Sequence, residues 1–296
     1  MRRNTGYIGR FAPSPSGPLH FGSLVAATAS FLDARHHHGQ WLLRMEDLDP
    51  AREPPEAAGQ ILAALELHGL HWDGPVLYQS RRLGAYADAL KTLENQQRLF
   101  ACTCSRQQIQ ADGGVYDGRC RLRKLPHSGA ALRVRVDDTV ITFDDRIQGS
   151  QSQSLERDCG DFVLLRKDGL FAYQLAVVVD DAEQGITDIV RGSDLLDSTA
   201  RQKFLQGLLQ LPAPRYAHVP VAVNARGQKL SKQHFARPLD LAQVVPSLLL
   251  ALDFLGQRPE PALISGSAQE VLLWGAEHWD IQAVPKLANI RLDHFA

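Results

Sequence analysis

The feature that most constrains this chain is a strand–loop–helix–strand pattern at its beginning. Residues 7–11 (YIGRF) predict a short buried strand, and residues 12–18 (APSPSGP) contain prolines and a glycine that forbid regular structure. A helical pattern of apolar residues follows from Phe21, and Gly39 is a stop signal. Residues 41–45 (WLLRM) predict a second strand. Together these segments predict a βαβ unit, and therefore the start of a parallel sheet.

The middle of the chain predicts an insert of a different kind. Amphipathic helices are expected over residues 57–70 and 85–99, after which cysteines appear and residues 132–136 (LRVRV) alternate as in an antiparallel sheet. Residues 170–179 are an apolar run, which we interpret as a strand buried on both faces. Residues 239–255 predict an apolar helix, and the tail beyond them a short helical appendix.

The composition bears on partners and location. Lys and Arg total 32 against 33 Asp and Glu, so the chain has no surplus of positive charge for non-specific phosphate binding, and any RNA contact must be local. No stretch approaches the ~18 apolar residues of a membrane span, and no signal-peptide pattern opens the chain. The 4 cysteines suit a metal site in a reducing compartment better than a disulfide framework. We expect a cytoplasmic protein without a membrane partner.

Two short motifs could bind a nucleotide. Residues 13–23 (PSPSGPLHFGS) lie where a strand leads into a helix, whose N-terminus attracts phosphate. There His20 can donate to a phosphate oxygen, and Gly22 lets a flat base or ribose approach the backbone. In residues 229–233 (KLSKQ), two lysines could clamp a triphosphate and stabilise charge on its α-phosphate. Taken singly, each motif is explained as well or better by a proline-rich turn or a solvated basic loop.

Together the two motifs resemble the paired HIGH-type and KMSKS-type signatures of class I aminoacyl-tRNA synthetases. Their order and their separation of roughly 200 residues also fit, while Ser23 and Gln233 depart from the family pattern. The resemblance implies ATP binding, with Mg²⁺ on the phosphates, and stabilisation of the transition state by His20 and Lys232. The implied ATP-binding residues are His20, Gly22, Lys229, Ser231 and Lys232.

Further segments are similar to glutamyl-tRNA synthetases: residues 10–17 (RFAPSPSG), 43–49 (LRMEDLD) and 191–199 (RGSDLLDST). Glutamate carries two carboxylates and one ammonium, so its pocket needs two cationic groups and one anionic group. Arg10 and Arg191 can supply forked donors to the carboxylates, in either order, and Glu46 can take the ammonium. The resemblance implies these glutamate-binding residues: Arg10, Ala12, Ser14, Glu46, Tyr173 and Arg191.

Three cysteines predict a tetrahedral zinc site: Cys102, Cys104 and Cys120. The residues alone leave the fourth ligand open, since Asp117 and His127 are commoner ligand types than Tyr116. The pattern C-x-C…Y-x-x-x-C nevertheless resembles that of the short glutamyl-queuosine tRNA(Asp) synthetases, and this resemblance implies Tyr116 as the fourth ligand of one structural Zn²⁺. Cys159 is expected to be a core residue. Residues 36–38 (HHH) are expected to be an exposed helix end, because consecutive helical side chains diverge.

The resemblance also implies a reaction in two steps. L-glutamate is activated by ATP to glutamyl-adenylate without tRNA, and the glutamate is then transferred to the queuosine base at the wobble position of tRNA(Asp). No side chain stands out as the base for the second step. Alternatives remain open: a truncated glutamyl-tRNA synthetase that charges the 3′ end of tRNA, a small HxGH-type adenylyltransferase, or a non-catalytic module descended from a synthetase. A monomer is expected.

We therefore predict an α/β fold: a Rossmann-type parallel-sheet catalytic core, an inserted α+β zinc-binding subdomain and a short C-terminal helical region. Too few residues follow the core for an anticodon-binding domain, and none is expected. The predicted segments are 1–100 for the first half of the core, 101–168 for the insert, 169–237 for the second half with the KLSKQ loop, and 238–296 for the helical region.

Overall fold

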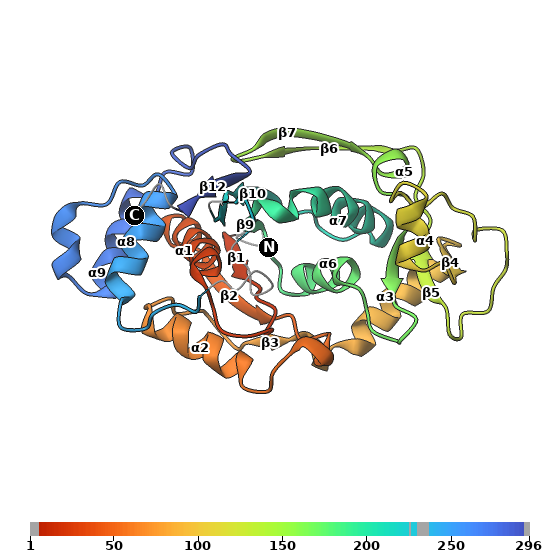
Figure 1. Ribbon diagram of the computed structural model, residues 1–296, viewed down its shortest axis with the longest axis horizontal. Helices are drawn as coiled ribbons and strands as arrows, with labels where there is room; N and C mark the ends of the chain where they lie inside the picture. Colours follow the sequence, from red (N-terminus) through yellow and green to blue (C-terminus); the bar gives the residue numbers. More distant parts are fainter. Residues whose placement is uncertain (1–5, 225, 230–236, 293–296) are drawn as a thin grey trace, which may run out of the picture.

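The computed structural model describes residues 6–224, 226–229 and 237–292. Figure 1 shows an elongated molecule, with the parallel strands near its middle and the C-terminal helices at one end. The helices are α1 (Phe21–His36), α2 (Ala57–Leu67), α3 (Leu83–Asn95), α4 (Arg106–Ala111), α5 (Leu155–Asp158), α6 (Tyr173–Glu183), α7 (Leu196–Leu209), α8 (Val244–Phe254) and α9 (Ala268–His278). The strands are β1 (Ile8–Phe11), β2 (Gln40–Met45), β3 (Leu77–Tyr78), β4 (Leu99–Cys102), β5 (Ala131–Val134), β6 (Val140–Asp145), β7 (Gly149–Ser154), β8 (Phe162–Leu165), β9 (Asp188–Gly192), β10 (Arg215–Val219), β11 (Val221–Val223) and β12 (Asn289–Arg291).

The predicted βαβ unit is confirmed. Strands β1 and β2 pair in parallel, with α1 between them in the chain. The chain turns after α1 at Gly39, whose N–H donates to the carbonyl of Ala34 at 2.8 Å. A Cβ added to Gly39 would lie 2.3 Å from the carbonyl oxygen of Tyr7. Only glycine therefore lets β2 begin this close to β1, and the stop signal has a steric cause.

The second half of the core returns to the first. Strands β9 and β10 pair in parallel, and the N–H of Thr187 donates to the carbonyl of Ile8 at 2.9 Å. This bond places the start of β9 beside β1. The fold is the α/β fold with a parallel sheet that the sequence predicts, and helix α1 packs against it through buried apolar side chains such as Leu24 and Leu32.

The predicted antiparallel insert is present. Strand β5 pairs antiparallel with both β4 and β8, and β6 pairs antiparallel with β7 along their whole length. Figure 1 shows β6 and β7 as a ribbon along the upper edge, running from beside β10 to α5 at the insert. At its core end the ribbon is anchored by parallel pairing of Asp145 with Tyr216 in β10. The segment limits at residues 100, 168 and 237 stay a prediction.

Several predicted elements are wrong or shifted. Residues 170–179 are not a strand, because α6 begins at Tyr173. A continuous run of buried apolar residues is compatible with a buried strand and with a buried helix, so the run alone does not distinguish the two. Helix α3 ends at Asn95 rather than at residue 99, since Gln97 takes a left-handed conformation with φ 57°. Helix α2 ends at Leu67 rather than 70, and α8 begins at Val244 rather than 239. Strand β12, which pairs in parallel with β11, was not predicted in the helical tail.

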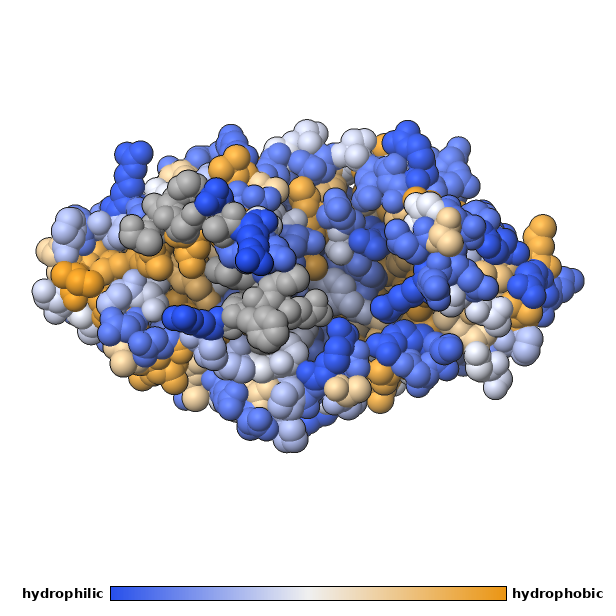
Figure 2. Space-filling view, in the orientation of Figure 1, coloured by the Kyte–Doolittle hydropathy of each residue, from blue (hydrophilic) through white to orange (hydrophobic). Residues whose placement is uncertain are grey.

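The surface is mostly polar on the face drawn in Figure 2, and apolar side chains gather at the end that carries α8 and α9. Exposed apolar residues of the C-terminal region include Ile264 and Leu273. Within the part of the chain that the structure describes, no helix has both the length and the apolar character needed to cross a membrane.

Candidate active site

A cavity of about 670 Å³ opens where β1, β2, β9 and β10 end. Its walls include residues that follow each of these strands, which is where open α/β sheets bind their ligands. Ser231 and Lys232 lie outside the described residues. All the other predicted glutamate- and ATP-binding residues line the cavity: Arg10, Ala12, Ser14, His20, Gly22, Glu46, Tyr173, Arg191 and Lys229.

Arg10 is anchored by the buried carboxylate of Asp181. Its side chain projects from β1, and its Nε donates to Asp181 Oδ1 at 3.2 Å. The same oxygen accepts from Nη2 of the fully buried Arg44 at 2.8 Å. Burial by itself would raise the pKa of Asp181, but Arg44 and Arg10 outweigh it and lower that pKa. Asp181 is therefore an ionised anchor shared by two arginines.

Arg191 is held by neutral groups instead. Its Nε donates to His218 Nε2 at 2.9 Å, and its Nη2 donates to Thr199 Oγ1 at 2.9 Å and to the Leu195 carbonyl at 3.2 Å. Its Nη1 lies 3.4 Å from the Tyr173 hydroxyl, which belongs to another residue of the cavity wall. Arg191 as a whole is 4% exposed, and its guanidinium is fixed in the protein through Nε and Nη2.

Glu46 brings a carboxylate to the cavity wall. It follows β2, and its Oε1 lies 3.5 Å from Arg44 Nη2. In the described structure this buried oxygen has no hydrogen-bond partner. Burial raises the pKa of Glu46, and the neighbouring Arg44 and Arg10 only partly oppose that effect. A buried carboxylate oxygen at the wall of a cavity can be satisfied by a cationic ligand.

The two nucleotide motifs are also placed at the cavity. His20 is the N-cap of α1: its Nδ1 accepts from the Ser23 N–H at 3.2 Å, and its Nε2 lies 3.2 Å from the Ser23 hydroxyl. This position puts His20 beside the positive end of the helix dipole. Lys229 Nζ donates to Asp194 Oδ2 at 2.6 Å, and both residues line the cavity. Asp194 is a residue that the sequence analysis did not propose for the site.

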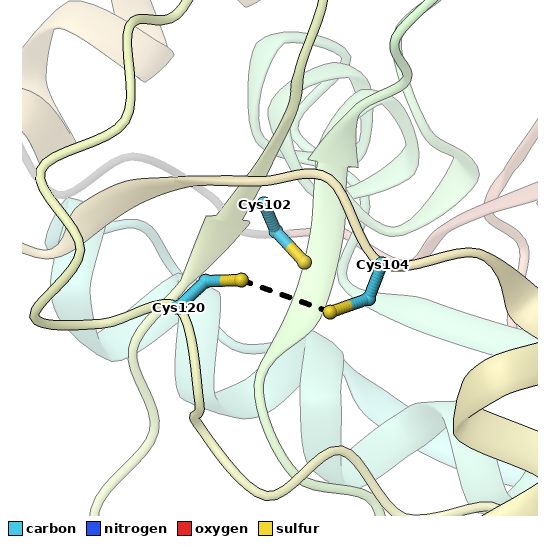
Figure 3. A group of neighbouring side chains, drawn as sticks. All are labelled: Cys102, Cys104 and Cys120. Carbon is cyan, nitrogen blue, oxygen red and sulfur yellow. Dashed lines mark hydrogen bonds between the residues drawn. The ribbon is translucent and has the colours of Figure 1, made fainter.

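The predicted metal ligands form a second cluster, in the insert. The sulfur atoms of Cys102, Cys104 and Cys120 lie within 4.8 Å of one another, and Figure 3 shows them converging. Cys104 and Cys120 are 3.7 Å apart. A zinc ion bound at about 2.3 Å by each sulfur would separate two tetrahedral ligands by about 3.8 Å, so the donor set fits zinc.

The Tyr116 side chain lies beside the three cysteines. Its hydroxyl lies 3.4 Å from Cys102 Sγ and accepts from the Cys120 N–H at 3.0 Å. Asp117 instead pairs with Arg119 at 2.8 Å, and His127 faces Glu94 at 3.5 Å. Of the three candidates for a fourth ligand, Tyr116 is therefore the one whose side chain reaches the thiols.

Two other predictions concern residues outside these clusters. Cys159 packs against the apolar core that the insert shares with α3, α6 and α7, and its Sγ lies 3.1 Å from the Gly160 carbonyl rather than among the other thiols. The side chains of the histidine triplet diverge: His36 Nδ1 contacts the Ala276 carbonyl at 3.0 Å, whereas the His37 ring stacks on Tyr7.

Sequence reasoning missed the residues that stand behind the cavity wall. Asp181 holds Arg10, and His218 holds Arg191, yet neither lies in a recognised motif. The sequence does contain a signal that Asp181 has a specific partner, because Asp180 and Asp181 directly follow a run of apolar residues. His218 within the apolar strand RYAHV is a similar signal, since a buried polar side chain requires a partner.

Comparisons with known proteins identify relatives of this chain. The family model "tRNA synthetases class I (E and Q), catalytic domain" matches residues 8–246. Curated proteins named glutamyl-Q tRNA(Asp) synthetase are similar over 96% of this chain: that of Pseudomonas syringae pv. syringae is 55% identical over 96% of its own length, and that of Pseudomonas aeruginosa 54% identical over 97%. A crystal structure of a glutamate tRNA ligase from Elizabethkingia meningosepticum, in complex with its amino acid, has a TM-score of 0.79 and 26% identity. That alignment covers 97% of this chain and 67% of the ligase.

Proposed function

This chain belongs to the class I tRNA synthetases of the glutamate and glutamine type, in the family of the glutamyl-Q tRNA(Asp) synthetases, and we propose that it activates L-glutamate with ATP and transfers it to queuosine in tRNA(Asp). The observation that carries the proposal is the cavity wall with two buried arginines and the Glu46 carboxylate, one oxygen of which is buried. Two positive groups and one negative group complement the charges of glutamate. The name of the similar proteins, glutamyl-Q tRNA(Asp) synthetase, supports queuosine in tRNA(Asp) as the acceptor of glutamate.

In this proposal, Arg10 and Arg191 each bind one carboxylate of glutamate, and Glu46 accepts the ammonium. The ammonium would satisfy the Glu46 oxygen that has no hydrogen-bond partner in the described structure. Tyr173 and Ser14 add hydroxyl groups at the cavity wall, where Ala12 also lies. Because both arginines are buried, their interaction with the ligand is screened little by water.

ATP would occupy the part of the cavity nearer α1. His20 and Gly22 lie at the helix N-terminus, and Lys229, with Ser231 and Lys232 beyond the described residues, would meet the phosphates. A glutamate carboxylate oxygen attacks the α-phosphorus, the bond to the bridging oxygen breaks, and pyrophosphate leaves. Mg²⁺ bound to ATP would neutralise charge on the phosphates. The protein contributes positioning and charge stabilisation, chiefly through His20 and the lysines.

In the second step a hydroxyl of the queuosine base attacks the mixed anhydride. The new ester bond forms, the bond between the acyl carbon and the phosphate oxygen breaks, and AMP leaves. The phosphate of the adenylate can accept the proton of the attacking hydroxyl. The insert would then face an anticodon loop rather than an acceptor end.

We propose that Cys102, Cys104, Tyr116 and Cys120 hold one structural Zn²⁺. The ion would join the end of β4 to the loop that carries Tyr116 and Cys120, a segment with little regular structure of its own. The convergence of three sulfurs and one hydroxyl supports this assignment. Zinc here would stabilise the insert and would take no part in the chemistry.

Pyrophosphate exchange tests the first step. The purified protein is expected to exchange labelled pyrophosphate into ATP when L-glutamate is added without tRNA, and to show little exchange with glutamine or aspartate. Exchange that depends on another amino acid, or on none, would contradict glutamate activation.

The acceptor is tested with labelled glutamate and two preparations of tRNA(Asp), one containing queuosine and one lacking it. Nuclease cleavage then separates the anticodon fragment from the 3′ fragment. Label is expected on the anticodon fragment of the queuosine-containing tRNA alone. Label on the 3′ adenosine would identify an ordinary glutamyl-tRNA synthetase and would leave the activation step intact.

A further inference from the structure

We infer that His218 and Asp145 are positioning residues that aim Arg191 at glutamate, with His218 held as the neutral tautomer protonated on Nδ1. This inference rests on the proposed role of Arg191 in binding the substrate. Both side chains are fully buried, and both lie behind the cavity wall rather than in it. They therefore act through Arg191 and not by contact with the ligand.

The tautomer of His218 follows from its neighbours. Arg191 Nε carries a hydrogen and can only donate, so His218 Nε2, at 2.9 Å, must accept and carries no proton. The ring proton is then on Nδ1, which lies 2.6 Å from Asp145 Oδ2. An ionised carboxylate can only accept, so this contact is satisfied as well. A protonated His218 would instead place two N–H donors against each other.

Asp145 is itself locked in orientation. Its Oδ1 accepts from the N–H groups of Ile147 at 3.1 Å, Gln148 at 2.9 Å and His218 at 3.1 Å. Because Oδ1 is engaged by three backbone donors, Oδ2 is the oxygen that faces the imidazole. Burial alone would raise the pKa of Asp145, but the hydrogen bond from His218 and the other donors lower it. The carboxylate is thus ionised and fixed.

The charges around His218 keep it neutral. Burial lowers its pKa, and the positive charges of Arg191 and Arg10 act in the same direction. Asp145 opposes them, yet the net direction is downward. With a neutral His218, the carboxylate of Asp145 is separated from Arg191 by the imidazole ring. Arg10, in contrast, contacts the carboxylate of Asp181 directly. The charge of Arg191 is therefore less neutralised by direct protein contacts than that of Arg10.

Asp145→Asn is the most direct test. The three backbone donors keep the amide oxygen at the Oδ1 position, so the amide NH₂ faces His218 Nδ1. The ring must then accept at Nδ1 and carry its proton on Nε2, against the N–H of Arg191. We expect the KM for glutamate in pyrophosphate exchange to rise on the order of 100-fold, with kcat less affected. The KM for ATP should stay within about twofold.

Two substitutions of His218 form a matched pair. The amide oxygen of His218→Gln reaches the place of Nε2 and can accept from Arg191, so the KM for glutamate should rise less than about tenfold. His218→Asn reaches only the place of Nδ1 and should behave like Asp145→Asn. His68→Gln is the control, because His68 is also a buried histidine but bonds to the Ala64 carbonyl, away from the site. Melting temperature and near-UV circular dichroism show whether each variant folds.

The tautomer is measured separately by long-range ¹H–¹⁵N NMR correlation of the His218 ring. We expect the proton on Nδ1 in the wild type and on Nε2 in Asp145→Asn. A proton on Nε2 in the wild type, or a folded His218→Asn variant with the wild-type KM for glutamate, overturns the inference. Failure of the wild type to exchange pyrophosphate with glutamate would instead count against the proposed function, and the NMR result would still stand.

Discussion

At the scale of single residues, the candidate pocket brings two buried arginines and one carboxylate to the same cavity. Arg10 and Arg191 are each anchored through Nε, and Glu46 keeps an oxygen without a hydrogen-bond partner in the described structure. A buried carboxylate oxygen without a partner costs stability, and a cationic ligand would offset that cost. Each role can be tested by a substitution that keeps the shape and removes the charge.

Glu46→Gln is expected to lower kcat/KM for glutamate by about 100- to 1,000-fold, because the ammonium loses its charged partner. Since burial raises the pKa of Glu46, the wild-type KM for glutamate should also rise as the pH falls through that raised pKa. In the variant it should be high and nearly independent of pH. Initial rates of pyrophosphate exchange measure both.

Glu66→Gln serves as the control, since Glu66 is an exposed acid on α2 and should leave these rates unchanged. A Glu46→Gln protein with the wild-type KM for glutamate would remove Glu46 from the ammonium site.

Residues of the cavity wall could be predicted because their types match the charges of a substrate. Arg10 and Glu46 stand in motifs that could be compared with a known family. His218 and Asp145 could not be found in this way, because their partners are protein groups brought together by β6, β9 and β10. The local sequence pattern does not indicate that Asp145 and His218 contact each other.

At the scale of elements, the prediction succeeded where the local signal is strong. The turn at Gly39 and the helix that follows His20 carry steric and capping signals within a few residues. Residues 173–183 carry none, since a run of buried apolar residues suits a strand or a helix equally. Strand β12 depends on pairing with the distant β11 and could not be seen locally.

The insert is the element whose integrity should depend on metal. Cys104→Ser is expected to lose bound zinc, and Tyr116→Phe should bind zinc at least about tenfold more weakly, since each loses a ligand. Atomic absorption after dialysis against a chelator measures the zinc content. Cys159→Ser is the matched control, because the Cys159 thiol faces the Gly160 carbonyl and not the cluster.

Full zinc content in Cys104→Ser would contradict the proposed site. Full affinity in Tyr116→Phe alone would leave three cysteines as ligands and would remove the tyrosine.

At the scale of the whole molecule, one buried aspartate joins regions that are far apart in the sequence. Asp33 in α1 accepts hydrogen bonds from the Tyr7 hydroxyl, from Arg146 at 2.6 and 3.0 Å, and from Trp279 Nε1 at 3.0 Å. These partners come from the N-terminus, the β6–β7 turn and the segment after α9. Asp33 thus connects the core, the ribbon and the C-terminal region.

Asp33→Asn is expected to lower the free energy of unfolding by about 3 kcal/mol at pH 7, since it removes one member of a buried ion pair. Burial would raise the pKa of Asp33, but Arg146, Tyr7 and Trp279 outweigh it and lower that pKa. Its stabilising contribution is therefore complete above about pH 4 and is lost as the pH falls through the folded-state value. The difference between wild type and variant should shrink in that range.

Urea titrations at several pH values measure this dependence. Asp137→Asn provides the control, because the Asp137–Arg98 pair is partly exposed on both sides and should contribute less than about 1 kcal/mol. A constant difference between Asp33→Asn and wild type at every pH would exclude the linkage.

The hydrogen bond between Thr187 and Ile8 has a further consequence, for the order of folding. It joins positions 179 residues apart, so the wall formed by β1 and β9 cannot close until nearly two thirds of the chain has left the ribosome. The strands of the insert pair over shorter sequence separations, so the insert can fold before β9 is available to pack beside β1. We therefore expect the candidate pocket to form late in folding, after the second half of the core has been synthesised.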